Sequence, residues 1–363
     1  MAYRPRGAAS SACAQKPIKQ IPGLERTAAA DVEVHSSMAK YLVTGIAGFI
    51  GSSIGHDLVR RGETVRGLDD FSTGKRQNIA DIENDIDFRQ VSLLDKAGLA
   101  SACDGIDYVI HQAALPSVPK SVVEPELTHA VNVNGTLNLL LAARDAGVKR
   151  VVYAASSSAY GESEVLPKRE DMVPKPISPY AVQKLTGEYY LQTFSKVYGL
   201  ETVSLRYFNI FGPRQDANSQ YSGVLAKFIT QMQLGESSTI FGDGEQSRDF
   251  TFVANAVQAN LKACVAPANE VSGRVFNIAT GTRFSLNQIF EMLGRIIGFN
   301  GPAKYAAPRT GDVRHSLADI SLAQKHLGYS ADVGFEEGLR RTVEWYEQQR
   351  ASATNQRVLT EQR

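Results

Sequence analysis

Three residues of the chain have the types and the spacing of an acid–base centre: Ser156, Tyr180 and Lys184. Tyr180 and Lys184 are four residues apart in the run YAVQK, so in a helix they lie on one face. A phenol has an ordinary pKa of about 10 and is a poor base, but a neighbouring ammonium favours the phenolate. We predict that Tyr180 takes a hydroxyl proton, that Lys184 lowers its pKa, and that Ser156 bridges the substrate hydroxyl to Tyr180.

The spacing of this pair also occurs on the edges of ordinary amphipathic helices, and three neighbouring features favour chemistry instead. Ser178 and Pro179 form a helix start that places Tyr180 in the first turn. A serine run at 156–158 follows an apolar strand expected at 151–155, and a glycine-rich turn lies further upstream. Together these features predict an active site.

The glycine-rich turn reads TGIAGFIG, with Gly45, Gly48 and Gly51 between an expected strand and an expected helix. Such glycines allow a tight turn, a close approach of backbone to phosphate, and packing of helix on strand. The helix that begins near Phe49 would direct its free N–H groups at a pyrophosphate. A three-glycine pattern alone is equally typical of a structural turn, so the prediction of a dinucleotide site depends on this context.

The position of one acid sharpens the cofactor prediction. Asp69 closes the second expected strand, eighteen residues after Gly51. A carboxylate there accepts hydrogen bonds from ribose hydroxyls and repels a 2′-phosphate, which favours NAD over NADP. The nearby cations Arg66, Lys75 and Arg76 weaken this choice.

The order of the expected elements predicts the fold class. Short apolar strands alternate with helices from residue 39 to about 206, which indicates an α/β fold with a doubly wound parallel Rossmann sheet. Strands are expected at 40–44, 64–69, 87–91, 108–111 and 151–155, and helices at 49–60, 128–146 and 178–198. Beyond Phe211 the pattern is less regular, with short helices at about 222–234 and 286–297. This part is expected to be a smaller, discontinuous C-terminal α/β substrate domain.

The expected domain boundaries follow from this pattern. Residues 38–210, with a returning segment near 250–282, are expected to bind the dinucleotide, and residues 211–249 and 283–350 the substrate. Residues 1–37 and 351–363 are expected to be disordered. For the first segment a transit peptide, or an upstream start codon before Met38, are the alternatives.

Composition excludes several classes of protein. Lys and Arg number 39 against 38 Asp and Glu, so the basic excess of nucleic-acid-binding and membrane-surface proteins is missing. No apolar run reaches the ~20 residues of a membrane span. Cys13, Cys103 and Cys264 are scattered, so neither a disulfide framework nor a zinc site is expected, and no metal is predicted. A reduced cytoplasm is the expected location.

The glycine turn and the Tyr180–Lys184 pair together resemble the extended short-chain dehydrogenase/reductase family, in particular its nucleotide-sugar epimerases, over about residues 39–348. The resemblance implies an NAD cofactor held by the turn and by further positions. The full predicted set is Gly45, Gly48, Phe49, Ile50, Gly51, Asp69, Asp70, Ser72, Thr73, Gly74, Ser92, Leu93, Ala113, Ala114, Asn132, Tyr180, Lys184 and Tyr207. Ser92 stands where the family often has an acid that meets the adenine, and His111 is interpreted as a core histidine.

The resemblance also implies a nucleotide-sugar site, in which Arg248 and Arg309 would clamp the diphosphate and Asp312 would face the ribose. The full predicted set is Ser117, Ser156, Ser157, Ser158, Asn209, Val224, Lys227, Phe241, Arg248, Arg309, Asp312 and Ser316. Dehydratases and decarboxylases of the family carry carboxylates where this chain has Ser157 and Ser158. Elimination chemistry is therefore disfavoured.

The resemblance predicts a UDP-N-acetylglucosamine 4-epimerase. Such an enzyme oxidises the sugar at C4 to a 4-keto sugar and re-reduces it on the opposite face, which interconverts UDP-GlcNAc and UDP-GalNAc. Ser316 stands where glucose-restricted enzymes have a tyrosine, so room is left for a 2-acetamido group. The alternatives are an epimerase of UDP-glucose or a UDP-hexuronic acid, a net-release dehydrogenase, and a non-catalytic NAD-binding regulator. A homodimer through helices at about 125–146 and 178–198 is expected by analogy.

Overall fold

The structure is a computed structural model that describes residues 38–216, 223–308 and 314–361, with side chains through Ser352. Seven parallel strands form one sheet in the spatial order β3-β2-β1-β4-β5-β6-β11. They are β1 (Lys40–Thr44), β2 (Thr64–Asp69), β3 (Asp87–Gln90), β4 (Tyr108–His111), β5 (Arg150–Ser156), β6 (Glu201–Tyr207) and β11 (Arg274–Ile278). This arrangement confirms the predicted α/β fold with a doubly wound parallel sheet.

The sheet is buried on both faces because its strands are apolar at successive positions. Along β1, Tyr41 and Val43 belong to one core, whereas Leu42 belongs to the other. The first core is completed by α1 (Phe49–Arg60), α8 (Val253–Val265) and α11 (Ser321–Leu327), and the second by α2 (Lys96–Cys103), α5 (Gly135–Asp145) and α6 (Pro179–Tyr198).

The strand order reverses at β1, which positions the site. The chain passes outward from β1 to β2 and β3, and then returns to the other side of β1 as β4. Connections that leave in opposite directions open a crevice at the carboxyl ends of the strands. Thr44, at the end of β1, lies beside Leu68 and His111 at this point. The fold therefore places a ligand crevice where β1 and β4 end.

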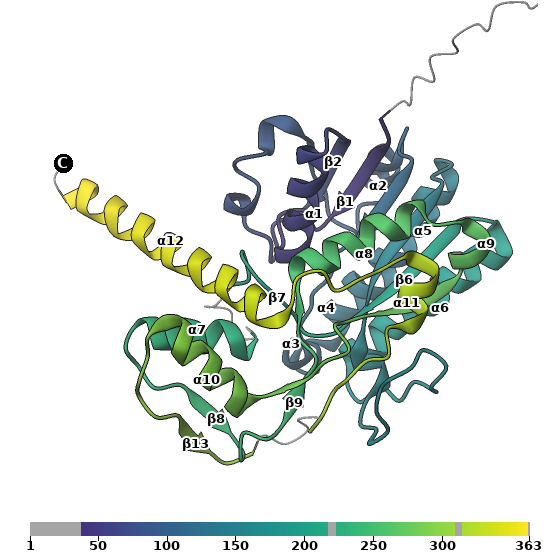
Figure 1. Cartoon of the computed structure of the whole chain (residues 1–363). Helices are drawn as coiled ribbons and strands as arrows, with labels where there is room; N and C mark the ends of the chain where they lie inside the picture. The colour runs from purple at the N-terminus through teal and green to yellow at the C-terminus, as the bar shows by residue number, and fades with distance from the viewer. Residues whose placement is uncertain (1–37, 217–222, 309–313, 362–363) are drawn as a thin grey trace, which may run out of the picture. The chain divides into compact units, whose positions relative to one another are not determined.

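A third apolar core lies outside the sheet, among α7 (Val224–Gln233), α10 (Leu286–Ile297) and α12 (Phe335–Glu361). Figure 1 shows α7 and α10 together with β8 (Thr239–Phe241) and β13 (Lys304–Ala306). The start of α10 has a reciprocal cap, in which Ser285 Oγ accepts the Gln288 N–H and the Gln288 side chain accepts the Ser285 N–H. This cap explains why α10 has the bounds predicted from sequence.

The remaining elements are short. They are α3 (Val118–Val123), α4 (Pro125–His129), α9 (Ala268–Val271), β7 (Ile210–Phe211), β9 (Ser247–Arg248), β10 (Thr251–Phe252), β12 (Phe284–Ser285), the tight turns η1 (Arg76–Asn78), η2 (Glu83–Asp85) and η4 (Ser157–Tyr160), and the wide turn η3 (Ala130–Asn134). The helix predicted over 128–146 is found, because the backbone stays helical from Pro125 to Asp145 through α4, η3 and α5; η3 is one widened turn within it.

The strand predictions for 40–44, 64–69 and 108–111 have the observed bounds, while β3 ends one residue early and β5 is longer by one residue at each end. The tail predicted as disordered differs, because α12 continues to Glu361 through Ala351, Ala353 and other good helix formers. Residues 1–37 lie outside the described chain, and the division into two domains stays a prediction. In the described ranges, no helix is both long enough and apolar enough to cross a membrane.

Candidate active site

The glycine-rich turn joins β1 to α1 and requires glycine at two positions. Gly45 has a φ of +70°, and a Cβ there would lie 2.7 Å from the backbone nitrogen of Ala113. A Cβ on Gly51 would lie 2.0 Å from the carbonyl oxygen of Gly45. The absence of side chains thus lets the backbones of β1, α1 and the segment after β4 approach one another.

The amino end of α1 is open to an anion. Gly48 precedes the helix in an extended conformation, and the first turn has neither a capping side chain nor an acidic residue. The N–H groups at Phe49 and Ile50 therefore belong to a turn that has no carbonyl partner within the helix. Both these groups and the helix dipole favour negative charge, so the residues present fit a dinucleotide pyrophosphate.

Asp69 ends β2 beside this turn and is 6% exposed. Its carboxylate accepts the N–H groups of Phe71 at 2.8 Å and Ala47 at 2.9 Å. Burial raises the pKa of Asp69, and these hydrogen bonds oppose the rise. Gly74 passes so close that a Cβ there would lie 2.7 Å from Asp69 Oδ1. Each carboxylate oxygen keeps acceptor capacity for a ribose hydroxyl, as the predicted role requires.

The three cations that weakened the choice of NAD are paired with carboxylates. The pairs are Arg66–Asp87 (2.7 Å), Lys75–Asp216 (2.7 Å) and Arg76–Glu83. Arg66 also donates to the carbonyls of Ala102 and Asp104. Each of these cations therefore already has a carboxylate partner and would have to leave it to bind a 2′-phosphate.

The first turn of α6 holds Tyr180, as the sequence predicted. Ser178 precedes the helix, and its Oγ accepts the Ala181 N–H at 3.2 Å. Pro179 occupies the first helical position, where a missing N–H breaks no helical bond. The Tyr180 N–H donates to Ser121 Oγ at 3.0 Å, so α3 also holds the start of α6.

Ser156 links the end of β5 to the Tyr180 phenol. Ser156 Oγ accepts the O–H of Ser158 at 2.8 Å and its N–H at 3.2 Å, so its own proton is left to donate. Burial raises the pKa of Tyr180 to about 12, and the hydrogen bond with Ser156 opposes that rise. Without cofactor, burial has the larger effect on this pKa. That the charge of Lys184, together with an oxidised nicotinamide, favours the phenolate stays a prediction.

Lys184 is buried one helical turn after Tyr180, with 4% of its surface exposed. Its Nζ donates to the Ala154 carbonyl at 2.9 Å and lies 4.8 Å from the centroid of the Tyr153 ring. Burial lowers the pKa of Lys184 to about 7, and the negative charge of Glu188 opposes this change. The residues predicted as catalytic thus come together where β5 ends and α6 begins.

Asn132 holds the segment after β4 to α6. Its Oδ1 accepts the Leu115 N–H at 2.8 Å, and its Nδ2 donates to the Leu115 carbonyl at 3.2 Å and to Gln183 Oε1 at 2.8 Å. Gln183 in turn donates to Thr128 Oγ1 at 2.9 Å. Both hydrogens of the Asn132 amide are therefore occupied by protein groups. Its position is that of a structural asparagine, and its contact with the cofactor stays a prediction.

His111 is a buried histidine whose two ring nitrogens are both hydrogen-bonded. Thr136 Oγ1 donates to the Asn132 carbonyl and therefore accepts from Nε2 at 3.0 Å. Thr44 Oγ1 accepts the Ala113 N–H and donates to Nδ1 at 2.8 Å. Burial lowers the pKa of His111 to about 3, so the ring is neutral at pH 7. These contacts agree with its interpretation as a core histidine.

The other predicted cofactor positions follow the carboxyl ends of four strands. Asp70, Ser72, Thr73 and Gly74 follow β2, Ser92 and Leu93 follow β3, Ala113 and Ala114 follow β4, and Tyr207 ends β6. The Tyr207 hydroxyl accepts from Gln112 at 3.0 Å and from Asn260 at 2.6 Å. Because parallel strands end at one edge of the sheet, all these positions share the edge that holds the glycine turn.

On the predicted substrate side, the structure brings together Asn209 and Ser316, which are 107 positions apart. Asn209 Nδ2 donates to the Asp249 carbonyl at 2.8 Å and to Ser316 Oγ at 3.4 Å. Asn209 also has a φ of +40°, a backbone region that residues other than glycine rarely adopt. Such strain clusters at functional sites, which agrees with the predicted role of this pair; that it lies on the substrate side stays a prediction.

The other predicted substrate residues are spread over several elements. Ser157 and Ser158 lie in η4, Val224 and Lys227 in α7, Phe241 in β8 and Arg248 in β9, whereas Arg309 and Asp312 lie outside the described residues. Ser117 caps α3, because its Oγ accepts the Lys120 N–H at 3.0 Å. Arg248 donates to the carbonyls of Ser247 and Arg314 at 3.0 and 3.1 Å.

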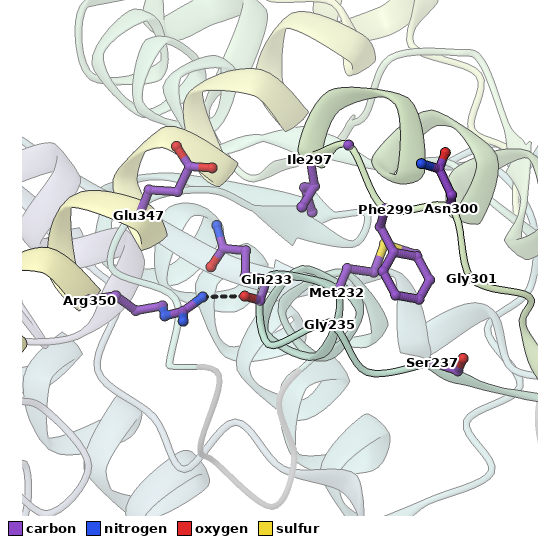
Figure 2. Close-up of a pocket in the computed structure, with 11 residues that line it drawn as sticks. Met232, Gln233, Gly235, Ser237, Ile297, Phe299, Asn300, Gly301, Glu347 and Arg350 are labelled. Carbon is purple, nitrogen blue, oxygen red and sulfur yellow. Dashed lines mark hydrogen bonds between the residues drawn. The ribbon is translucent and has the colours of Figure 1, made fainter.

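Two cavities of the described chain lie away from the predicted catalytic residues. A cavity of about 560 Å³ lies among α7, α10 and α12, where Arg350 donates to the Gln233 carbonyl at 2.6 Å (Figure 2). No predicted site residue lines it. The other, of about 390 Å³, is lined by Glu245, Ser247, Arg283, Ser285, Gln288, Arg314 and His315. Two of its lining residues, Ser247 and His315, directly precede Arg248 and Ser316 in the sequence, but neither Arg248 nor Ser316 lines the cavity.

Sequence reasoning missed a buried ion pair beside the acid–base residues. Arg206 Nε donates to Glu188 Oε1 at 2.9 Å, and Nη2 donates to Oε2 at 2.7 Å. Glu188 follows Lys184 by four residues, the same spacing that separates Lys184 from Tyr180. Repeating that spacing once more along α6 would have found Glu188, but no local pattern points to its partner on β6.

Residues 41–279 match the NAD dependent epimerase/dehydratase family. Together with the glycine turn, the parallel sheet and the phenol–ammonium pair, this match shows that the chain belongs to that family. Its cofactor is therefore NAD.

This chain covers almost the whole length of several relatives. The UDP-glucose 4-epimerase of Mycolicibacterium smegmatis is 38% identical over 310 residues, which is 84% of this chain and 97% of the relative. The solved structure of a UDP-N-acetylglucosamine 4-epimerase from Methanobrevibacter ruminantium, in complex with UDP-N-acetylmuramic acid, is similar with a TM-score of 0.82 and 40% identity over 86% of this chain and 99% of that chain. A UDP-glucose 4-epimerase from Thermus thermophilus in complex with NAD has a TM-score of 0.77 and 36% identity over 85% and 99%.

Proposed function

We propose that the chain is a 4-epimerase that interconverts UDP-GlcNAc and UDP-GalNAc. The observation that carries this proposal is the meeting of Ser156, Tyr180 and Lys184 at the sheet edge that also holds the glycine turn. Oxidation and re-reduction of a sugar alcohol need an acid–base group beside a dinucleotide. The epimerase activities named for the three relatives support the reaction class.

Each side chain has one task in this proposal. Bound NAD supplies the redox chemistry at C4 of the sugar. Tyr180 takes the proton of the 4-hydroxyl and returns it when the hydroxyl forms again on the other face. Ser156 is hydrogen-bonded to the Tyr180 side chain and would orient the hydroxyl, while the Lys184 ammonium and the oxidised nicotinamide would favour the phenolate by their positive charge. Asp69 and the open end of α1 hold the cofactor through its ribose and its pyrophosphate.

Small side chains support two parts of the proposal: the preference for an N-acetylated sugar and the restriction to epimerisation. Ser316, beside Asn209, leaves space next to the sugar where a tyrosine would fill it. Ser157 and Ser158 follow Ser156 in η4 and provide no carboxylate to expel a hydroxyl or a carboxyl group. We therefore propose epimerisation alone, with Arg248 and Arg309 on the diphosphate.

An epimerase of UDP-glucose is the second candidate. The named activities of the relatives from Mycolicibacterium smegmatis and Thermus thermophilus favour it. A serine at position 316 would accept glucose as well as its 2-acetamido derivative, because a cavity without a clash does not reject the smaller sugar.

The experiment that tests both candidates incubates the purified protein with UDP-GlcNAc and, separately, UDP-glucose, without added NAD, and follows the products by NMR. UDP-GalNAc in the first sample is expected. Turnover of UDP-glucose alone would contradict the role of Ser316 and leave the reaction class intact. No turnover of either sugar, even with NAD supplied, would contradict the proposed function. A Tyr180→Phe variant is the control for a contaminating epimerase.

We further propose that two copies of the chain pair through α3, α4 and α6, which pack on one another. Large apolar side chains are exposed there. They are Val122, Val123 and Leu127 on α3 and α4, and Val182 and Tyr189 on α6. Val182 and Tyr189 are seven residues apart and lie on one face of α6, so the same face of a second copy would cover them.

Sedimentation velocity tests this pairing. The chain is expected to sediment as a dimer and the double variant Val182→Glu/Tyr189→Glu as a monomer, because two charges would be buried at the interface. Val265→Glu, at an exposed valine that ends α8, is the matched control and is expected to remain dimeric. A wild-type monomer at micromolar concentration would contradict the proposal.

A further inference from the structure

Three ionisable residues follow one another at intervals of four on α6: Tyr180, Lys184 and Glu188. This spacing places them on one face of the helix, and Lys184 and Glu188 are both buried. Glu188 has no exposed surface at all. A carboxylate that is cut off from water in this way needs a partner of opposite charge.

That partner comes from β6. The guanidinium of Arg206 makes two parallel hydrogen bonds to the Glu188 carboxylate, at 2.7 and 2.9 Å. The Arg206 Cζ also lies 4.7 Å from the ring centroid of Tyr160, so its flat face is covered. The geometry fixes the position of the carboxylate and favours its ionised form.

Along α6, Lys184 lies between Tyr180 and Glu188, four residues from each. One of the three hydrogens on its Nζ bonds to the Ala154 carbonyl, and 4% of the residue is exposed to water. A buried ammonium loses its proton unless a negative charge compensates for the lost hydration. A nearby anion is therefore needed if Lys184 is to carry charge beside Tyr180.

The ionisable groups that face Lys184 leave one candidate for that anion. From β4 and β5, His111 and Tyr153 are uncharged at pH 7, because burial lowers the pKa of His111 to about 3 and raises that of Tyr153 well above its usual range. From α6, burial raises the pKa of Tyr180 to about 12, so its phenol is uncharged. Burial also raises the pKa of Glu188, but the hydrogen bonds and charge of Arg206 oppose that rise and favour its carboxylate form. Arg206 on β6 is a cation on the far side of that carboxylate. In the described chain, Glu188 is the group whose charge opposes the loss of the Lys184 proton.

We propose that Glu188 is a positioning residue of the acid–base centre: its carboxylate, held by Arg206, keeps Lys184 charged one helical turn from Tyr180. The inference rests on the proposed function only in so far as Tyr180 is the base. Its physical core is a row of alternating charges, Lys184, Glu188 and Arg206, in which the outer cation holds the carboxylate and the carboxylate holds the ammonium.

The experiment measures the charge on Lys184 directly. Protein with lysines labelled with ¹³C at Cε is titrated in the NMR spectrometer, and the Lys184 signal is assigned by its loss in a Lys184→Met variant. In the wild type Lys184 is expected to titrate at a pH of about 7. In Glu188→Gln, which keeps the size of the side chain and removes its charge, the midpoint is expected to fall by about one pH unit or more.

A matched control is available elsewhere in the same sheet. Arg150 and Glu201 form a second arginine–glutamate pair at the opposite ends of β5 and β6, and Glu201→Gln is expected to leave the Lys184 midpoint unchanged. An unchanged midpoint in Glu188→Gln, or an equal fall in Glu201→Gln, would overturn the proposal. Failure to turn over any UDP-sugar would overturn the proposed function without affecting this titration.

A second variant covers the case in which Glu188→Gln does not fold. Replacing both partners, as Glu188→Met/Arg206→Met, removes the buried pair without leaving one charge alone, and such replacements commonly preserve stability. The Lys184 midpoint is again expected to fall by about one unit, because burial remains and the nearer charge is gone. A wild-type midpoint in this folded variant would show that Glu188 serves packing alone.

Discussion

At the amino ends of β5 and β6, Arg150 and Glu201 form a buried ion pair, and near the carboxyl end of β6, Arg206 forms another with Glu188. All three nitrogens of the Arg150 guanidinium are hydrogen-bonded, to Glu201 at 2.5 and 2.8 Å and to the carbonyls of Ala263 and Cys264 at 2.8 and 2.9 Å. Arg206 Nη1 is instead buried with no hydrogen-bond partner among the described residues.

The difference shows how one sheet separates stability from chemistry. At the amino end every nitrogen of the arginine has a hydrogen-bond partner, as a structural contact requires. At the carboxyl end, burial displaces the pKa values of His111, Tyr180 and Lys184 from their ordinary ranges, and Asn209 carries a strained backbone. Perturbed groups and strain of this kind cluster at functional sites and are tolerated because the rest of the fold is well satisfied.

The assignment of chemistry to the carboxyl end of the sheet would fail most clearly if Tyr180 were not needed for activity. Tyr180→Phe is expected to lower kcat for the epimerised sugar by about 10³-fold or more, which corresponds to about 4 kcal/mol of barrier, because it removes the proton-transfer group. Its melting temperature should stay within a few degrees of the wild type. A variant that keeps more than a tenth of the activity would contradict the assignment of the base.

The buried His111, at the end of β4, is expected to make the stability of the folded protein depend on pH. The folded protein holds it neutral down to a pH of about 3, whereas the unfolded chain takes up a proton below about 6.5. The unfolded state therefore binds more protons in this window, and stability falls as the pH falls, by about 1.4 kcal/mol per unit and by about 5 kcal/mol over the whole window.

Urea unfolding at pH 7, 6, 5 and 4 measures this effect as a slope. His111→Gln is expected to have a shallower loss of stability with falling pH than the wild type, whatever its stability at pH 7. His129→Gln, at an exposed histidine of α4, is the control and should keep the wild-type slope. Equal slopes in all three proteins would refute the prediction.

Breaking the amino-end pair should affect stability and leave chemistry alone. Arg150→Met is expected to lower the free energy of unfolding by about 3 kcal/mol, because two buried carbonyls and Glu201 lose their donor. This figure is at the low end for a buried pair, since the Glu201 side chain is 26% exposed and water replaces part of the contact. The kcat of the folded variant should stay within about twofold of the wild type; a tenfold loss would erase the distinction between the two ends.

The smallest expected effect concerns the sugar. Ser316→Tyr is expected to lower the ratio of kcat/KM for UDP-GlcNAc to that for UDP-glucose by about tenfold, or about 1.4 kcal/mol, because the larger side chain occupies the space of the acetamido group. Ser316→Ala, which keeps the site small, should leave the ratio unchanged. A ratio that moves equally in both variants would assign the effect to the hydroxyl that meets Asn209.

Local pattern was enough to predict much of the fold. The strands Lys40–Thr44 and Thr64–Asp69 and the helix Leu286–Ile297 were predicted with their observed bounds, because each is an apolar run or period closed by a turn or a cap. The helix over 128–146 was also predicted, but the wide turn at Ala130–Asn134 within it was not, because such a turn has no local sequence signal. The same limit applies to the site, where Glu188 was within reach of the pattern but Arg206 was not.

The sequence by itself determined the order of strands and helices, the glycine turn, and the placing of Tyr180 and Lys184 on one face, because these depend on spacings of a few residues. Only the tertiary structure decided that Asn209 meets Ser316 across 107 positions and that Arg206 holds Glu188. It also decided how far burial raises the pKa of Tyr180, to about 12 in the chain without cofactor, which no local spacing indicates. The physical reason is burial: a charge is favoured or disfavoured by the groups that exclude water from it, and in this fold those groups come from distant parts of the chain.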